Sequence, residues 1–302
     1  GVQRASRHCD AVCARCLTLS SAGRARVEIE VKKEAQGAAP LERRVKHLVL
    51  FSGGACSWAA AKRVVEQHGP DGVVLLFADT MMEDEDLYRF IDQAAANVGA
   101  PLVRIADGRT PWQVMQDMRM MGGGFLGADP CSKVLKRELL NRWQKENCDP
   151  ETTTIHIGLD WTEQHRIDRV QERGKPWRFN APMAERPLFS KADILAWMRA
   201  EGIEPPRLYS LGFSHNNCGG FCVKAGQAQF ERLYRTMPER YRQHERDEEE
   251  TRYIVGDYTI LTYQRGGKRI PITLKEFRER IEAQSDLFDP FDWGGCGCAI
   301  DA

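Results

Sequence analysis

Apolar and amphipathic segments alternate along the chain from residue 45 onward. Runs rich in apolar residues, bounded by polar or turn residues, predict buried strands at residues 45–51, 72–78, 102–105 and 153–158. Segments with apolar side chains at helical spacing follow these runs and predict helices at residues 58–67, 83–98, 111–121 and 134–146. Strands and helices that alternate with short connections are typical of an α/β fold, a doubly wound and mostly parallel sheet that binds ligands at the carboxyl ends of its strands.

The pattern changes beyond residue 185, where strands no longer alternate with helices. The sequence here predicts helices at residues 194–201 and 225–234, and a hairpin at residues 260–263 and 268–272. The charge block at residues 245–252 predicts the solvated end of a helix. The last third of the chain is therefore expected to be a mainly helical extension.

Composition narrows the class of protein. The chain has 302 residues, with 43 basic and 43 acidic side chains, so attraction of the whole protein to nucleic acid or an anionic membrane is not predicted. Apolar runs stay well short of the roughly 20 residues that span a bilayer. Ten cysteines without a recognisable secretion signal favour reduced thiols over a disulfide scaffold. A cytoplasmic location with no membrane partner is the resulting expectation.

A glycine-rich loop lies between the first predicted strand and its helix. Ser52, Gly53 and Gly54 follow the strand, and Ser57 directly precedes the helix. Glycines let backbone N–H groups approach an oxyanion closely, and the helix N-terminus adds partial positive charge. The Walker pattern Gly-x4-Gly-Lys is absent, so this is a phosphate-binding loop of another type. Asp79, at the end of the second predicted strand, is expected near the same ligand.

Several motifs together resemble one superfamily. The Ser-Gly-Gly-x-x-Ser loop resembles that of the PP-loop ATP pyrophosphatases, the adenine nucleotide alpha-hydrolase-like superfamily. Four further segments, at residues 77–80, 131–136, 158–166 and 187–218, resemble its phosphoadenylyl-sulfate reductase-like branch. That branch includes DNA phosphorothioation sulfurtransferases and phage-borne relatives. The resemblance covers about residues 45–240. Two positions depart from it, because many members have Asp where this chain has Cys56, and Arg is common where it has Asp160.

The resemblance implies a function and a set of site residues. It implies an enzyme that binds ATP with Mg²⁺, adenylates an acceptor oxygen with release of pyrophosphate, and supports sulfur transfer. The expected nucleotide-binding residues are Ser52, Gly53, Gly54, Ser57, Asp79, Gly158, Asp160 and Glu163. The cations expected to offset phosphoryl charge are Lys133, Lys136 and Arg166, although lysines on an amphipathic helix are often simply solvated.

The cysteines carry a second set of expectations. Relatives bind a [4Fe–4S] cluster through cysteines of the two corresponding regions, so the resemblance implies the ligands Cys131, Cys218, Cys222 and Cys296, with zinc as the alternative metal. Cys298 is the candidate nucleophile of the tail, and Cys296 and Cys298 could equally exchange these roles or form a redox disulfide. Near the N-terminus, Cys9, Cys13 and Cys16 have a spacing seen in radical S-adenosylmethionine enzymes, but no barrel pattern surrounds them, so we favour unpaired cysteines in a flexible arm.

The sequence leaves the acceptor and the exact reaction open. The acceptor is a tRNA, a DNA or a small metabolite; a sulfur donor such as a cysteine desulfurase is implied, and a homodimer is left open. One alternative is thiol-dependent reduction of adenylyl sulfate or phosphoadenylyl sulfate, and another is a non-catalytic nucleotide- or cluster-sensing module. The expected organisation is a flexible segment at residues 1–44, a PP-loop domain at residues 45–185, and a cysteine-containing extension at residues 186–302 that packs on it.

Overall fold

The core of the molecule is a mostly parallel sheet. The computed structural model describes residues 28–31, 45–123, 129–283 and 289–294. Within these residues, six strands pair in the order β1-β4-β3-β2-β5-β6, and all neighbours from β4 to β6 are parallel. The strands are β1 (Glu28–Val31), β2 (His47–Leu50), β3 (Val73–Asp79), β4 (Leu102–Ala106), β5 (Thr154–Ile157) and β6 (Arg178–Asn180). This topology confirms the predicted doubly wound α/β fold.

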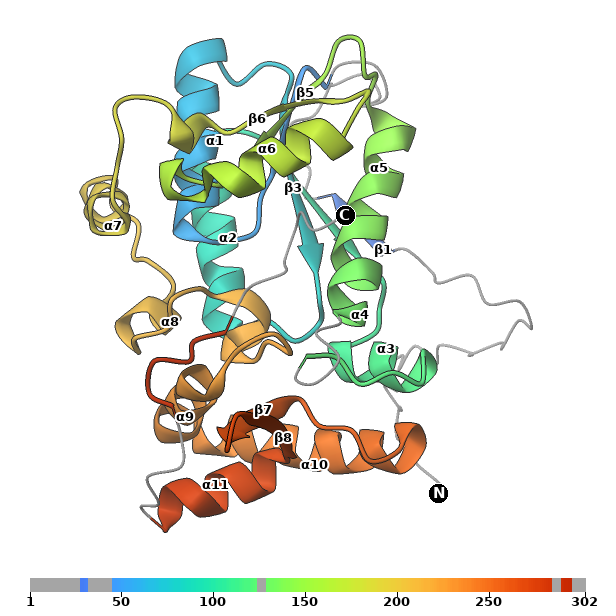
Figure 1. Cartoon of the computed structure of the whole chain (residues 1–302). Helices are drawn as coiled ribbons and strands as arrows, with labels where there is room; N and C mark the ends of the chain where they lie inside the picture. Colours follow the sequence, from blue (N-terminus) through green and yellow to red (C-terminus); the bar gives the residue numbers. More distant parts are fainter. Residues whose placement is uncertain (1–27, 32–44, 124–128, 284–288, 295–302) are drawn as a thin grey trace, which may run out of the picture.

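Helices cover both faces of this sheet (Figure 1). α1 (Ala55–His68) and α2 (Glu85–Val98) pack on one face, and α5 (Leu139–Asn147) packs on the other. The other helices of this part of the chain are α3 (Pro111–Asp117), α4 (Pro130–Ser132) and α6 (Gln164–Arg173). The central strand β2 shows why the fold forms, because Leu48 packs on the α5 side and Val49 on the α1 and α2 side, both fully buried. A strand buried on both faces must be apolar at consecutive positions, which explains the continuous apolar runs of the sequence.

The C-terminal part is mainly helical and packs on the first part. It contains α7 (Lys191–Ala200), α8 (Arg207–Ser210), α9 (Gln227–Thr236), α10 (Pro238–Val255), β7 (Leu261–Arg265), β8 (Lys268–Ile272) and α11 (Leu274–Glu282). Trp112 and Met115 of α3 share one apolar core with Phe230 of α9, Tyr241 of α10 and Phe277 of α11. Among the described residues, no helix is both long and apolar enough to cross a membrane.

Some elements differ from their predicted form. The edge strands β1 and β6 are not predicted, since they are short and carry no apolar run; β1 lies within the stretch expected to be flexible. The helix predicted at residues 111–121 ends at Asp117, shortly before Arg119, whose φ of 49° is incompatible with helix. The helix predicted from residue 134 begins earlier, at Pro130, and passes through a π-helical turn, Lys133–Glu138.

The charge block at residues 245–252 is only partly solvated: Arg246, Glu249 and Glu250 are exposed as predicted, but Glu248 is buried. The block forms most of the C-terminal half of α10, where Glu248 is 2% exposed and accepts hydrogen bonds from the backbone N–H of Ile260 (3.2 Å) and of Leu274 (2.6 Å). Burial raises the pKa of Glu248 to about 7. A carboxylate that ties α10 to β7 and α11 is therefore hidden within a run of charged surface residues.

Candidate functional site

The predicted phosphate loop lies at the topological switch point of the sheet. β2 has β3 on one side and β5 on the other, so the chain leaves the carboxyl ends of β2 and β5 toward opposite sides of the sheet. The loop after β2 is Ser52-Gly53-Gly54, and α1 begins directly behind it. In doubly wound folds, ligands bind in the crevice that forms at this point.

The loop is held by its own serines. The Ser57 hydroxyl donates to the carbonyl of Gly54 (2.8 Å) and lies 3.3 Å from the hydroxyl of Ser52, which accepts from the N–H of Gly54 at 3.4 Å. Gly53 has a φ of 74°, and a side chain there would meet Leu87 at 2.8 Å. Ser52 is exposed while Ser57 is buried. The loop therefore presents Ser52 and the start of α1 to solvent.

The loop after β5 closes against the first turn of α1. A Cβ atom at Gly158 would lie 2.6 Å from the Cα of Ser57 and 2.7 Å from its backbone nitrogen. Such a distance is far below any real carbon–carbon contact, so only glycine allows the two loops to approach in this way. The structure thus brings Gly158 and Ser57 together, as the sequence predicts for a shared site.

The two positions that depart from the family pattern face each other. The Sγ atom of Cys56, in the first turn of α1, lies 4.0 Å from Oδ2 of Asp160. The other carboxylate oxygen of Asp160 accepts the backbone N–H of Thr162 at 2.9 Å, which fixes the side chain. Burial, together with the negative charges of Asp160 and Glu163, raises the pKa of Cys56 to about 11. The Cys56 thiol is therefore protonated at neutral pH and is a poor nucleophile.

Two residues of this site are not predicted from the sequence. The hydroxyl of Tyr209, in α8, accepts the backbone N–H of Ala55 at 3.0 Å, so it lies directly on the N-terminus of α1. Lys191, the first residue of α7, places its ammonium 4.7 Å from the centre of the Tyr209 ring and donates to the carbonyl of Ser214. Burial lowers the pKa of Lys191. The only sequence signal was that both residues lie in the segment at 187–218 that resembles the family.

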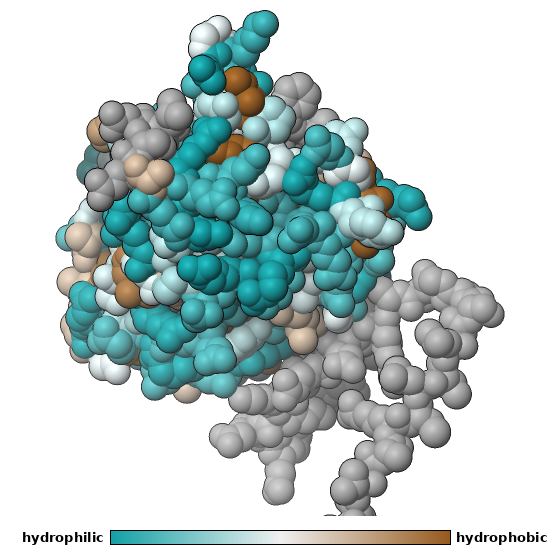
Figure 2. All heavy atoms as spheres, turned by 90° about the horizontal axis from the view of Figure 1, so that it is seen from below, coloured by the Kyte–Doolittle hydropathy of each residue, from teal (hydrophilic) through white to brown (hydrophobic). Residues whose placement is uncertain are grey.

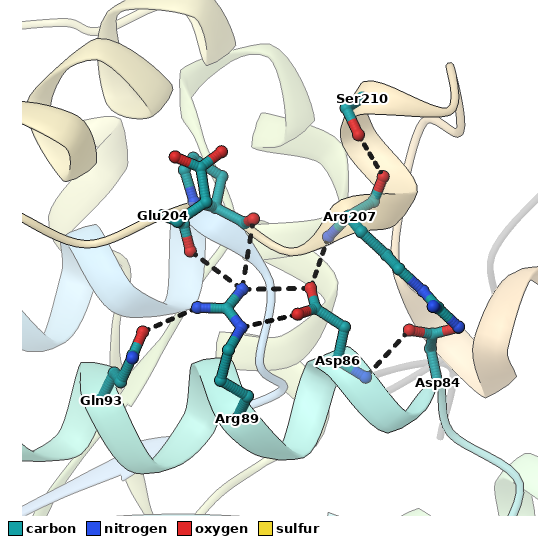
Figure 3. A network of polar contacts seen from close by, with 8 residues as sticks. Asp84, Asp86, Arg89, Gln93, Glu204, Arg207 and Ser210 are labelled. Atoms are coloured by element: carbon teal, nitrogen blue, oxygen red, sulfur yellow. Dashed lines mark hydrogen bonds and ion pairs between the residues drawn. The ribbon is translucent and has the colours of Figure 1, made fainter.

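A polar network fixes the segment that carries Tyr209 (Figure 3). Arg89 of α2 binds both carboxylate oxygens of Asp86 (2.6 and 3.0 Å) and the carbonyl of Glu204 (3.1 Å). Arg207 binds Asp84 at 2.8 Å through its guanidinium and Asp86 at 2.7 Å through its backbone N–H. The four-residue helix α8 is thereby attached to the N-terminus of α2, and Tyr209 is positioned at the phosphate loop.

Asp79 and Glu163 have local partners. Asp79, at the end of β3, accepts the Tyr88 hydroxyl at 2.9 Å and the N–H of Met81 at 2.8 Å. Glu163 pairs with Arg166 one helical turn away, and the side chain of Arg166 is 19% exposed. Arg166 thus lies close to Asp160 in the chain, but its charge is already partly offset.

A second cluster contains the predicted cysteine ligands. Cys131, Cys218 and Cys222 line one pocket together with Lys136 and Thr80. All three cysteines are buried, and the Thr80 hydroxyl lies 3.8 Å from the Sγ atom of Cys218. Cys218 has a left-handed backbone with a φ of 49°, a conformation that is uncommon for residues other than glycine and often marks functional sites.

The structure distinguishes the two candidate lysines. The π-helical turn directs Lys136 inward, where it lines the cysteine pocket and lies 3.8 Å from the carboxylate of Glu83. The side chain of Lys133 is 58% exposed and lies 3.9 Å from Glu138, a surface pair of little energetic weight. Single π-helical turns are frequent at functional sites. Lys136 is therefore the candidate functional cation, and Lys133 is a solvated lysine.

We expect Lys136→Met to lower the free energy of unfolding by roughly 1–2 kcal/mol, because it removes the cation beside the buried Glu83 carboxylate. The loss is smaller than for a directly hydrogen-bonded buried pair, since 3.8 Å is too long for a hydrogen bond. Lys133→Met is the matched control and should change stability by less than about 0.5 kcal/mol. Urea unfolding measures both variants, and equal effects would contradict the assignment.

The described cysteines do not by themselves form a metal centre. Their pocket has an accessible volume of about 20 Å³, enough to hold a water molecule. Among the described residues, no group of three or more His, Cys, Asp or Glu side chains is arranged to hold a metal ion. Cys296 and Cys298 lie outside the described residues, as do Cys9, Cys13 and Cys16. The donor chemistry of Cys131, Cys218 and Cys222 suits a cluster or zinc, and the predicted fourth ligand is among the residues that the structure does not describe.

Fold and site together define a doubly wound α/β protein with a glycine-rich loop at its switch point and a second site, the cysteine-lined pocket. Two solved structures are similar to this chain. One is the phosphoadenylyl-sulfate reductase of Candida auris in a phosphate complex, with 16% identity over 55% of this chain and 78% of that chain, at a TM-score of 0.39. The other is the NH3-dependent NAD synthetase of Campylobacter jejuni with a nitrate ion, with 11% identity over 70% of this chain and 85% of that chain, at a TM-score of 0.36. No protein-family model and no curated protein matches the chain.

Proposed function

We propose that this protein is an enzyme of the PP-loop type that binds ATP with Mg²⁺, adenylates an acceptor oxygen and releases pyrophosphate in support of sulfur transfer. The proposal rests on the position of the Ser52–Ser57 loop at the switch point. Gly158 packs against Ser57, and α1 begins within the loop, so the N-terminus of the helix is part of it. Loops of this construction bind phosphate oxygens through backbone N–H groups and the helix dipole.

The reaction itself requires little covalent chemistry from the protein. The acceptor oxygen attacks the α-phosphorus, the bond from that phosphorus to the bridging oxygen breaks, and pyrophosphate leaves with the electron pair while the acceptor proton passes to water. Positioning and charge stabilisation supply most of the acceleration in such transfers. Gly53, Gly54, Ser52 and Ser57 hold the departing pyrophosphate in this proposal.

Charged residues around the loop complete the proposed site. Lys191, whose charge acts on the Cys56 thiol, and Arg166, which pairs with Glu163, are the cations that offset phosphoryl charge in this proposal. Asp160 supplies, from the loop after β5, the carboxylate that Cys56 cannot supply from α1. Carboxylate oxygens are suitable ligands for the Mg²⁺ that accompanies ATP.

A single hydroxyl tests the loop assignment. We expect Ser52→Ala to lower ATP-dependent pyrophosphate release at least tenfold, because an exposed hydroxyl at the loop tip would bind a phosphate oxygen. A coupled assay for pyrophosphate measures the rate. Thr152→Ala, which removes an exposed hydroxyl before β5 at the opposite end of the sheet, should leave the rate unchanged. Equal rates for Ser52→Ala and the unaltered protein would contradict the assignment.

The two cysteines predicted as the reactive pair of the tail suggest a second candidate function, the reduction of an adenylylated sulfate. The Cys298 thiolate would attack the sulfate sulfur and displace the adenosine phosphate, and the Cys296 thiol would then release sulfite and leave a Cys296–Cys298 disulfide. Two thiols are thereby oxidised while sulfur is reduced by two electrons. Sulfite release from phosphoadenylyl sulfate that Cys298→Ala abolishes, together with no pyrophosphate release from ATP, would replace the first proposal with this one. ATP binding with neither product would leave a nucleotide-sensing module.

A further inference from the structure

One surface of the C-terminal part has a strong local excess of positive charge. Between Tyr258 and Lys275 the sequence contains four basic residues and no acidic residue, although the whole chain has equal numbers of both. Three of the four, Arg265, Lys268 and Arg269, surround the turn between β7 and β8, and all three are exposed. We call these three residues the basic tip.

The geometry of the hairpin brings these charges together. Its turn is formed by Gly266 and Gly267, whose φ values of 57° and 73° allow a two-residue connection. Arg265 and Lys268 are direct cross-strand partners in the register. Like charges that face each other across a strand pair destabilise a hairpin. A polyanion bound at the tip would remove this repulsion.

Carboxylates do not neutralise the tip within the described part of the chain. Other cations of this region have partners, since Arg252 pairs with Asp257 and Arg278 with Glu245. No ion pair joins the three tip residues to any described acidic side chain. No described carboxylate therefore offsets the charge of the basic tip, although the Arg265 side chain also hydrogen-bonds with that of Tyr263.

The hairpin is a firmly held ribbon rather than a loose loop. Leu261 and Ile272, at its base, are buried in the core shared with α10 and α11. The guanidinium of Arg280 lies 4.1 Å from the centre of the Tyr263 ring and adds a further cation behind the tip. The carbonyl of Thr262 accepts the side-chain amide of Gln227 at 2.9 Å. The tip is thus presented on a rigid support.

The base of the hairpin also adjoins the cysteine pocket. Gln227 lies shortly after Val223 and Lys224, which line that pocket. A side chain at Gly123 would meet the carbonyls of both Val223 and Ile260, so the segment before β7 packs directly on the pocket wall. Figure 1 shows β7 and β8 among α9, α10 and α11, and Figure 2 shows that the molecular face on this side is predominantly hydrophilic.

We propose that the basic tip binds the phosphate backbone of a nucleic acid and directs it toward the site. The inference deepens the proposed function and rests on it, since it names nucleic acid as the class of acceptor. Arginine and lysine are the principal phosphate contacts of nucleic-acid-binding proteins, and a two-stranded ribbon fits a groove of a duplex. The charge is local, which is consistent with a chain that is neutral as a whole.

Fluorescence anisotropy without nucleotide tests the proposal. The probes are labelled single-stranded DNA, duplex DNA and single-stranded RNA of about 20 nucleotides, longer than the roughly 4–16 that one binding fold covers. The double variant Arg265→Glu with Lys268→Glu should weaken binding at least tenfold at about 0.1 M salt and reduce the slope of log K against log salt by about 2, because two phosphate contacts are lost. The probe bound most tightly identifies the kind of nucleic acid.

A matched control separates the tip from general electrostatics. Arg142→Glu with Lys145→Glu changes the net charge by the same amount at exposed positions of α5 and should alter affinity less than twofold. The charge-reversed hairpin could misfold, so the neutral double variant Arg265→Gln with Lys268→Gln is a second test. It should reduce the slope of log K against log salt by the same amount. The proposal is overturned if no probe binds saturably or if both charge-reversed doubles weaken binding equally. Loss of pyrophosphate release would not affect this assay, so the two proposals fail separately.

Discussion

Replacing Gly158 with alanine is expected to reduce ATP-dependent pyrophosphate release by more than about a hundredfold while the protein stays folded. The added methyl group would lie 2.6 Å from the Cα of Ser57, so the loop after β5 must move away from the first turn of α1. That movement separates Asp160 from Cys56 and opens the loop that holds the departing phosphates. Pyrophosphate release under saturating ATP measures the effect.

Overpacking also costs stability, typically about 1–3 kcal/mol, so a control of similar cost is needed. Gly69→Ala provides it, because Gly69 follows α1 with a φ of 76° and open space around it. That backbone strain should lower the free energy of unfolding by about 1 kcal/mol without touching the site. Similar activity in the two variants would show that Gly158 matters only for folding, and the assignment of the loop would be wrong.

Sequence alone predicts those parts of the fold that are buried on two sides. β2, β3 and β4 appear as apolar runs because both of their faces are covered, and their order of connection then places the Ser52 loop at a carboxyl end. The edge strand β6 contains only three residues, one of them exposed, so it has no apolar pattern to detect. A strand can therefore be predicted from an apolar run when both of its faces are buried.

The same reasoning explains which site residues could be predicted. Ser52, Gly53, Gly54 and Ser57 lie in one short segment whose chemistry is visible locally. Lys191 and Tyr209 reach the loop only because α7 and α8 pack against α1 and α2. A contact between segments so far apart in the sequence cannot be predicted from the residues of either segment. The choice between Lys133 and Lys136 was equally hidden, since it depends on a π-helical turn.

The site shows how two unusual residues can be understood together. Taken singly, Cys56 and Asp160 each weaken the resemblance to the PP-loop enzymes. In space, Asp160 lies 4.0 Å from the Cys56 thiol, so in the proposed function its carboxylate would replace the acid that many PP-loop enzymes have at the position of Cys56. A protonated thiol adds no charge of its own, so Asp160 is the acidic group at this point of the loop.

At the opposite end of β2, a histidine cluster is expected to make stability depend on pH. His156 is 1% exposed, its Nε2 atom lies 3.0 Å from Nδ1 of His47, and the His47 ring stacks on His68 at 4.0 Å. Burial, reinforced by the charges that His47 and His68 acquire when protonated, lowers the pKa of His156 from 6.5 to about 3. The pKa of His47 is also lowered, chiefly by burial.

The direction of the effect follows from proton binding. Because the folded pKa lies below the unfolded value, the unfolded chain binds more protons between pH 6.5 and about 3. Stability is therefore complete above pH 6.5 and decreases as the pH falls toward 3. Each pH unit within this window changes the free energy of unfolding by about 1.4 kcal/mol, so His156 alone should account for a loss of about 2 kcal/mol at pH 5.

Urea unfolding at pH 7.5 and pH 5 on His156→Gln measures this contribution. The variant should lose most of the pH dependence, because glutamine fills the buried position and bonds to His47 without titrating. His165→Gln, at an exposed position of α6, is the matched control and should keep the full dependence of the unaltered protein. The prediction is wrong if His156→Gln and His165→Gln lose the same free energy of unfolding between pH 7.5 and pH 5. The acid sensitivity would then come from carboxylates elsewhere and not from the buried, neutral His156.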